Sequence, residues 1–369
     1  MENKRKRVEM ISSLRVLPPI REAYQQVTAY AKPKEIAFFS FNSKRQQLLN
    51  SKRFNSKLKQ LLNSKSSLGI LLKETKFPLN MKSGFPQDYL KRSLEPEGIF
   101  PLVKCLESLS SPDLANVSLD KEKIKNGFVT WRGIITKIIS TPYSLNDEWI
   151  LLATKRDGKI YIAEWESPEK QQHKFGKGEE HELLSYYGYK AETLLTRDRE
   201  TGEMARETNT NIQYCTVFST KLGNHNLTLG GEVDAILQEP KDGDFQSQYL
   251  EIKTNRIITN PKQERSFRRY KLMKTWAQSF LAGVQHVLFA YRDDDGNILK
   301  TQTFKTLEFP RMARSENLWD PNRLLTFGSK ALDFIQENMK QDDITYRIAF
   351  DPPSKEITIE IDENQEKII

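Results

Sequence analysis

The chain has 369 residues, with 57 basic and 49 acidic side chains, a net charge of +8 and an isoelectric point near 9.1. It is 37% hydrophobic and 29% charged, which is typical of a soluble globular protein that buries a real core. No apolar run reaches the length of about eighteen residues that a membrane span needs, and we expect neither a spanning helix nor a signal peptide.

Cysteine and histidine are scarce: the chain has two cysteines, Cys105 and Cys215, and four histidines. Two cysteines imply no disulfide framework and fit a reducing compartment. Because these residues lack the spacing of zinc ligands, the sequence argues against a structural zinc site. The positive charge favours an anionic partner such as nucleic acid, although a basic surface without such a partner fits the charge equally well.

The first thirty residues are expected to be flexible. They include the basic cluster NKRKR (3–7), which fits either a nuclear import signal or a solvated tail. A tandem repeat follows, FNSKRQQLLNSKR at 41–53 and FNSKLKQLLNSKS at 54–66. The repeated unit is too short to build a repeat architecture. We expect a basic surface loop or short helix with poor order.

From about residue 77 the pattern is that of a compact domain with several hairpins. Residues 148–167 alternate around an Asp-Gly turn, and residues 213–238 do the same around Gly-Asn. Two further hairpins are expected around 293–297 and 351–356. Antiparallel hairpins with a few interspersed helices predict an α+β fold.

One segment, residues 263–283, has apolar positions every three or four residues, which predicts a helix that ends at Gly283. Its apolar face is expected to carry Phe267, Tyr270, Met273, Ala277 and Phe280.

Two short segments carry paired polar residues. LGGEVDAILQ (229–238) reads as one strand with Glu232 and Asp234 on the same face, and QYLEIKTNR (248–256) carries Glu251 and Lys253 in the same relation. If the two strands pair, three carboxylates and one lysine share a surface. Crowded like charges in a dry place need positive partners.

Divalent cations would supply that charge, and oxygen ligands suit Mg²⁺ or Mn²⁺. A neighbouring lysine would face a phosphate or the attacking water. Carboxylates, metal ions and lysine in this arrangement are typical of two-metal phosphodiester hydrolysis. The alternative is a ladder of ion pairs on a solvated sheet face, which the apolar flanking residues disfavour.

Other polar positions are weaker signals by themselves. Glu192, in YYGYKAETLLT (186–196), reads as an ordinary helix glutamate. Lys271, Lys274 and Gln278 lie on one side of the predicted helix, where they could reach a phosphate backbone, but such stripes are more often solvated.

Five motifs, taken in order, resemble the DXO/RAI family of RNA decapping nucleases: FVTWRGIITKI (128–138), GYKAE (188–192), GGEVD (230–234), LEIKT (250–254) and KTWAQSFLAG (274–283). The resemblance runs from about residue 35 to 325. It implies a mixed-sheet core similar to the PD-(D/E)XK nucleases, flanked by helices and additional antiparallel hairpins. The expected organisation is a basic segment over 1–30, one nuclease domain over 31–350 with the repeat inserted at 41–66, and a C-terminal hairpin strand and tail over 351–369.

The resemblance also implies a metal site for two divalent cations, Mg²⁺ or Mn²⁺. Asp234 would bridge the two ions and Glu232 would ligate one of them. Glu251 and the backbone carbonyl of Ile252 would hold the other. Glu192 would complete the catalytic cluster, in part through water.

Four further residues would contact substrate on the same basis. Lys253 and Gln278 would orient the attacking water and the scissile phosphate. Arg132 would grip RNA phosphate through its planar guanidinium. Lys274, on the predicted helix, is also expected to bind substrate through the phosphate backbone.

The implied activity is removal of incomplete or noncanonical 5′ caps from RNA, with pyrophosphohydrolase and 5′→3′ exonuclease activity in some members. The expected partner is RNA with a 5′ cap or 5′ triphosphate. Binding to a membrane is not expected. Some members bind a nuclear 5′→3′ exoribonuclease, so a non-catalytic stabilising cofactor is one alternative, and a DNA endonuclease on the same core is another. The basic cluster indicates the nucleus, with the cytoplasm as the alternative location.

This sequence departs from the family pattern at one place. Relatives often carry an acidic, tyrosine-rich segment between EIAFFS and SGFP, where this chain has its basic repeat. The contacts at the substrate entrance are therefore not carried over.

Overall fold

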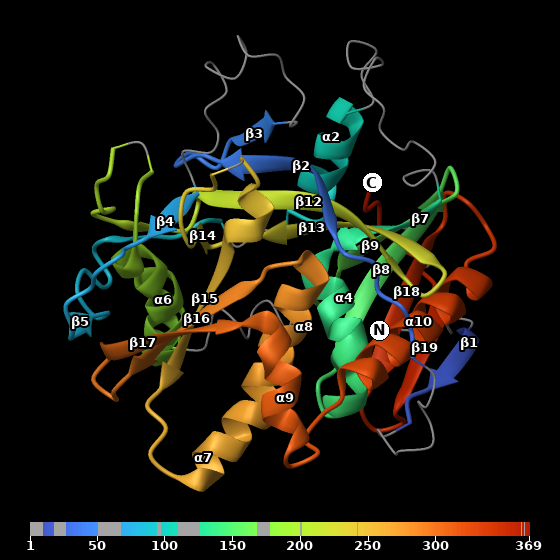
Figure 1. Cartoon of the computed structure of the whole chain (residues 1–369). Helices are drawn as coiled ribbons and strands as arrows, with labels where there is room; N and C mark the ends of the chain where they lie inside the picture. Colours follow the sequence, from blue (N-terminus) through green and yellow to red (C-terminus); the bar gives the residue numbers. More distant parts are fainter. Residues whose placement is uncertain are drawn as a thin grey trace, which may run out of the picture.

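The computed structural model describes residues 10–17, 27–50, 68–93, 97–109, 126–167, 178–199, 201–241 and 243–362, with residues 364 and 366–369 (Figure 1). Within these ranges two large sheets and the helices between and beside them form the fold, which confirms the α+β class. None of the helices in these ranges combines the length and hydrophobicity that crossing a membrane requires.

The larger sheet has ten strands in the order β1-β19-β18-β8-β9-β7-β13-β12-β2-β3. Most neighbours are antiparallel, but β7 runs parallel to both β13 and β9. The strands are β1 (Met10–Arg15), β2 (Lys34–Phe41), β3 (Gln47–Asn50), β7 (Gly127–Trp131), β8 (Trp149–Arg156), β9 (Lys159–Glu164), β12 (Gln213–Leu222), β13 (His225–Glu232), β18 (Thr345–Asp351) and β19 (Glu356–Ile361).

The smaller sheet has seven strands in the order β10-β4-β14-β15-β16-β17-β5. It is mixed, since β15 is antiparallel to β14 and parallel to β16. Its strands are β4 (Gly69–Leu71), β5 (Leu79–Asn80), β10 (Thr196–Arg197), β14 (Ala235–Ile236), β15 (Tyr249–Arg256), β16 (His286–Arg292) and β17 (Asn297–Lys305), and β6 (Tyr89–Leu90) pairs separately with β11 (Thr208–Asn209).

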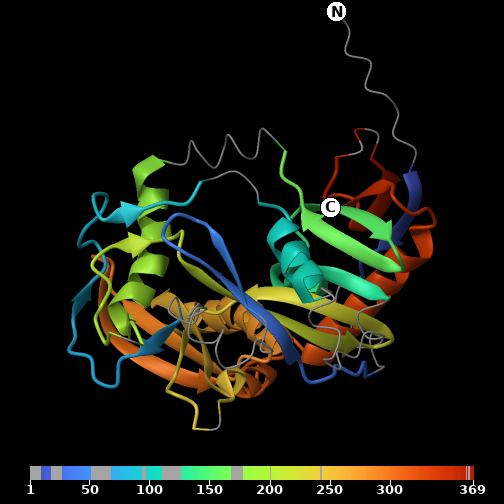
Figure 2. The ribbon, with the colours of Figure 1, turned by 90° about the horizontal axis from the view of Figure 1, so that it is seen from above.

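Helices cover both sheets. The helices and helical turns are α2 (Phe100–Leu109), α4 (Arg132–Ser140), η3 (Thr141–Tyr143), α6 (Gly178–Leu195), η4 (Phe245–Gln248), α7 (Pro261–Ser266), η5 (Phe267–Lys271), α8 (Leu272–Ala282), η6 (Thr306–Glu308), α9 (Phe309–Arg314) and α10 (Pro321–Asn338). The largest hydrophobic cluster packs α4, α8 and α10 between one face of each sheet. On the opposite faces, α2 covers the ten-stranded sheet, and α6 (green in Figure 2) lies against the seven-stranded sheet.

The N-terminal segment and the repeat differ in part from expectation. Residues 10–15 form the edge strand β1 on β19, so the prediction that the first thirty residues are flexible is wrong there. The first repeat copy makes a tight turn and then β3, which pairs with β2, instead of a loop or helix. Residues 3–7 and 51–66 lie outside the described residues.

The predicted hairpins are confirmed. β8 and β9 join at Asp157-Gly158, and both residues have positive φ, as a tight hairpin turn requires. β12 pairs with β13, β16 with β17, and β18 with β19.

The prediction of one strand over 229–238 is wrong. The chain leaves the ten-stranded sheet at Glu232 and joins the seven-stranded sheet at Ala235. There β14 pairs with β15 over two residues, so the expected pairing with 248–256 is confirmed but short. Glu232 and Asp234 therefore flank a crossing between two sheets.

The predicted helix over 263–283 is interrupted by a π-helical turn over Phe267–Lys271 and ends at Gly283 with φ 68°. The wider turn inserts an extra residue into the helical repeat. As a result Tyr270, expected on the apolar face, is 48% exposed, while Phe267, Met273 and Ala277 are buried.

Candidate active site

Three of the predicted carboxylates line one cavity of about 490 Å³. Glu192 reaches it from α6, and Glu232 and Asp234 reach it from the crossing between the sheets. Several residues between Thr196 and Gln213 also line it, and Met204 and Ile212 are among the apolar ones. Folding thus brings together residues about forty positions apart in the sequence, Glu192 and Glu232.

Burial and neighbouring negative charges raise the pKa of these carboxylates. Burial raises the pKa of Glu192 well above its usual value, and the charges of Asp234 and Glu232 add to that effect. Burial likewise raises the pKa of Asp234 to about 7, with repulsion from Glu251 as the next cause. A site that disfavours its own negative charges is one that a cation stabilises.

Glu251 and Lys253 form a charged pair beside the cavity. Glu251 is 1% exposed, and its Oε1 accepts a hydrogen bond from Lys253 Nζ at 2.5 Å. Burial alone would raise the pKa of Glu251, but the charges of Lys253 and Arg132 hold it below its usual value. The prediction that Glu251 and Lys253 share one face of the strand is confirmed.

Arg132 lies at the start of α4 and is 5% exposed. Its Nη1 donates to Glu251 Oε2 at 3.2 Å, and its Nε has no hydrogen-bond partner in the described part of the chain. The alternative to a phosphate contact was an ion pair on the surface. That alternative is excluded, because the guanidinium is buried and binds the buried Glu251.

Lys274 and Gln278 line a different cavity of about 340 Å³, between α4 and α8. Lys274 Nζ donates to Asp147 Oδ2 at 3.0 Å on the surface. The wall of this cavity on α4 begins at Gly133, the residue after Arg132. Lys274 and Gln278 therefore line a second cavity, next to the residue that follows Arg132.

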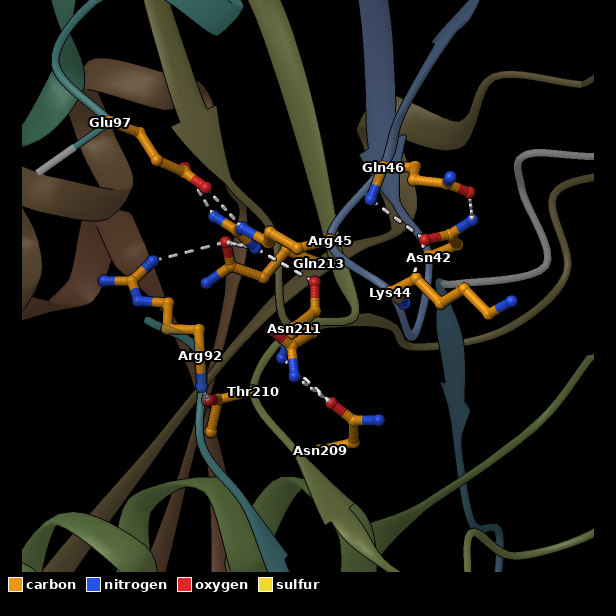
Figure 3. Close-up of polar contacts among 10 residues, drawn as sticks. All are labelled: Asn42, Lys44, Arg45, Gln46, Arg92, Glu97, Asn209, Thr210, Asn211 and Gln213. Atoms are coloured by element: carbon orange, nitrogen blue, oxygen red, sulfur yellow. Dashed lines mark hydrogen bonds and ion pairs between the residues drawn. The ribbon is translucent and has the colours of Figure 1, made fainter. Parts of the chain in front are cut away.

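A polar cluster at the cavity rim contains residues that the sequence did not indicate (Figure 3). Gln213, a wall residue of the carboxylate cavity, accepts hydrogen bonds at Oε1 from Arg45 at 2.7 Å and from Arg92 at 3.4 Å. Burial raises the pKa of Glu232, and Arg92 is the positive charge that opposes this most strongly. No motif marks Arg92, since Gln213 and Glu232 lie more than a hundred residues further along the chain.

Arg45 is the hub of that cluster and belongs to the first repeat copy. It binds Glu97 through two hydrogen bonds of 2.6 and 2.7 Å, donates to the Asn211 carbonyl at 2.9 Å, and stacks on Phe41. The first repeat copy thereby braces the loop that forms one wall of the carboxylate cavity.

Replacing Arg45 with alanine is expected to lower the free energy of unfolding by about 2 kcal/mol, because it removes several charge-assisted hydrogen bonds. Lys44→Ala, in the same turn, is the matched control and should change it by less than about 0.5 kcal/mol, since Lys44 is exposed. Urea unfolding of both variants measures the difference. Equal stability of the two variants would contradict a bracing role.

The chemistry of the donor set fits a divalent cation. All the candidate side-chain ligands are carboxylates, and oxygen-only ligands suit Mg²⁺ or Mn²⁺. Among the residues that the structure describes, however, no three Asp, Glu, His or Cys side chains are gathered closely enough to enclose an ion as they stand. Glu251 is held by Arg132 and Lys253, and one oxygen of Asp234 accepts the Ile252 N–H at 2.7 Å. Binding a cation therefore requires these side chains to turn toward one another.

Comparison with known proteins bears on this site. The model of a family described as RAI1-like PD-(D/E)XK nuclease matches residues 31–369. The "Decapping and exoribonuclease protein" of Xenopus laevis is 33% identical over 331 residues, which are 88% of this chain and 80% of the frog protein. The "Decapping nuclease RAI1" of Cryptococcus neoformans is 33% identical over 279 residues, 72% of this chain and 70% of the fungal protein.

Solved structures agree on the fold. The crystal structure of S. pombe Rai1 superposes with a TM-score of 0.75 at 24% identity and covers 95% of this chain and 99% of that one. Candida albicans Rai1 in complex with pU5-Mn²⁺ gives a TM-score of 0.76 at 22% identity, with coverage of 95% and 93%. The expected similarity to PD-(D/E)XK nucleases is confirmed.

Proposed function

Because the chain belongs to the RAI1-like PD-(D/E)XK nuclease family, a family of metal-dependent decapping nucleases, we propose that it removes incomplete or noncanonical caps from the 5′ ends of RNA. The observation that supports this most directly is the cavity with Glu192, Glu232 and Asp234 on its wall, next to the Glu251–Lys253 pair. Carboxylates that can bind divalent cations, beside a fixed lysine, suit hydrolysis of a phosphate ester.

In this proposal the side chains of Glu192, Glu232, Asp234 and Glu251 and the carbonyl of Ile252 would hold two divalent cations, Mg²⁺ or Mn²⁺, with Asp234 shared between them. When bound, such cations lower the pKa of a water molecule and neutralise charge on the phosphate.

The positive residues of the chain have separate tasks. Lys253 is kept charged, since Glu251 and Asp234 raise its pKa although burial lowers it. It can therefore donate to a phosphate oxygen throughout the neutral pH range. Arg132 is buried and binds the carboxylate of Glu251. We therefore propose that its main role is to position Glu251, and that a contact with phosphate is secondary. Lys274 and Gln278, in the adjacent cavity, remain proposed substrate contacts.

Finer activities belong to the same proposal. Release of diphosphate from 5′-triphosphate RNA and 5′→3′ digestion of 5′-monophosphate RNA would use the same carboxylates. The frog relative is named a decapping and exoribonuclease protein, which supports testing both. A nuclear location and binding to a nuclear exoribonuclease are also proposed, from the basic cluster and the family.

The test uses one RNA body with five 5′ ends: monophosphate, triphosphate, unmethylated cap, methylated cap and NAD. Purified protein with Mg²⁺ or Mn²⁺ is expected to release a cap-containing or diphosphate fragment, identified by mass, and EDTA should abolish the release. If no RNA is cleaved with either metal, the hydrolase proposal fails, and a stabilising role toward an exoribonuclease becomes the explanation to test by pull-down.

A further inference from the structure

A third cavity, of about 440 Å³, opens where β15 ends. Its wall starts at Thr254, the residue that follows Lys253, and continues over α7 and the π-helical turn to the end of β16. Three cationic residues, Arg256, Lys271 and Arg292, line it, and none of its lining residues is acidic. We call it the basic cavity.

Two of these cations have no acidic partner among the described residues. In the part of the chain that the structure describes, neither Lys271 nor Arg292 forms an ion pair. Lys271 Nζ donates to the Thr254 carbonyl, and Arg292 Nη1 donates to the Asp293 carbonyl at 2.9 Å. Burial, followed by repulsion from Lys253 and Arg292, lowers the pKa of Lys271 to about 8. Neighbouring half-buried cations without a carboxylate are stabilised by an anion from outside.

The third cation, Arg256, already has an acidic partner. Arg256 forms an ion pair with Asp294, and both side chains are largely exposed, so this pair contributes little and can open. The anionic ligand is therefore expected to contact Lys271 and Arg292 first.

An aromatic ring lies at the same cavity. Tyr270, which the π-helical turn directs outward, is 48% exposed and lines the wall, and the Arg269 guanidinium lies 5.2 Å from the centre of its ring. A positive groove with an exposed aromatic side chain is the arrangement that binds a single-stranded nucleic acid, through its phosphates and one stacked base.

We propose that the basic cavity binds the phosphodiester backbone of the RNA on the 3′ side of the cleaved bond. This inference rests on the proposed function. A strand advances about 3.3 Å per residue, so Arg256 lies about 10 Å along β15 from Lys253. An RNA whose 5′ end occupies the carboxylate cavity and whose scissile phosphate meets Lys253 reaches the basic cavity within its first few nucleotides.

The test compares two RNAs that share one cleavable 5′ end, a dinucleotide and a ten-nucleotide RNA. In the variant Lys271→Gln/Arg292→Gln, KM for the longer RNA is expected to rise about tenfold or more, and KM for the dinucleotide to stay within about twofold. Fluorescence anisotropy with a labelled ten-nucleotide RNA, without metal, should show the slope of log Kd against log salt falling by about 1.4, or about 0.7 per lost phosphate contact.

Matched variants make the result specific. Arg311→Gln removes an exposed cation from α9 that does not line the basic cavity, and should leave both measurements unchanged. Tyr270→Ala, at an exposed position that should not disturb folding, is expected to weaken binding of the longer RNA severalfold through lost stacking.

An equal rise in KM for both RNAs, or an unchanged salt slope, would overturn the basic cavity as a backbone site. Suppose that the wild type cleaves neither RNA, but that the slope of log Kd against log salt is smaller for the double variant than for the wild type. The proposed function then fails, while the RNA-binding role of the basic cavity stands.

Discussion

Replacing Asp234 with asparagine is expected to reduce metal-dependent cleavage at the RNA 5′ end roughly a thousandfold or more. Asp234 is the proposed bridge between two cations, and the amide is a neutral, weaker ligand. The shape of the side chain and its hydrogen bond from the Ile252 N–H at 2.7 Å can be kept. Single-turnover cleavage of the best of the five RNAs measures the loss.

The same variant should be more stable than the wild type without metal. Because the folded-state pKa of Asp234 is raised from 3.8 to about 7, the folded protein favours the protonated acid. Stability of the metal-free wild type is therefore lost as the pH rises from about 4 to 7. At pH 8 we expect Asp234→Asn to gain on the order of 2 kcal/mol in the free energy of unfolding.

Adding metal should make the wild type more stable than Asp234→Asn. Mn²⁺ is expected to raise the melting temperature of the wild type and to leave that of Asp234→Asn nearly unchanged, since ligand binding stabilises only the protein that binds it. Asp295→Asn, in the exposed turn between β16 and β17, is the control and should behave as the wild type. An active Asp234→Asn protein, or one with the metal response of the wild type, would refute the assigned role.

Replacing Arg132 with methionine is expected to lower the free energy of unfolding by about 3 kcal/mol. The change leaves Glu251, 1% exposed, without the partner that lies 3.2 Å away, and breaking a buried ion pair costs about 3–5 kcal/mol. Lys253 still pairs with Glu251, which keeps the loss at the lower end. Cleavage should fall as well, because Glu251 loses its fixed orientation.

A double-mutant cycle separates the ion pair from general packing. Adding Glu251→Gln to Arg132→Met removes the carboxylate charge that has lost its Arg132 partner, so part of the lost stability should return while cleavage stays low. If the losses from the two single variants simply add, the two side chains do not interact as the structure indicates. The variant Arg132→Lys keeps the positive charge and tests the geometry of the contact, since a lysine ammonium cannot reproduce the planar guanidinium.

Much of the site could be predicted from short stretches of sequence. Glu251 and Lys253 are two residues apart on one strand, and their shared face follows from the two-residue period of a strand. The hairpins at Asp157-Gly158 and Gly223-Asn224 are local in the same way. The five motifs extended this to Glu192, whose residue type and spacing alone indicated only an ordinary helix.

Predictions failed where an outcome depends on packing between distant elements. The strand over 229–238 divides because the chain changes sheets after Glu232, and local alternation holds no information about which sheet a residue joins. Tyr270 faces outward because a π-helical turn shifts the helical register. The pairing of Arg132 with Glu251 also depends on packing between distant elements, while the predicted contact of Arg132 with RNA phosphate stays a prediction.

The sequence by itself determined the class of fold, the family and the residue types of the site, since these follow from periodicity, turn residues and short motifs. Only the tertiary structure decided how these residues meet. It placed Arg45 and Arg92 on Gln213 at the cavity rim, Lys274 and Gln278 in a neighbouring cavity, and Lys271 and Arg292 in the basic cavity beyond Lys253. The reason is physical: burial and charge pairing depend on distances between side chains that lie tens to hundreds of residues apart in the chain, and those distances exist only after folding.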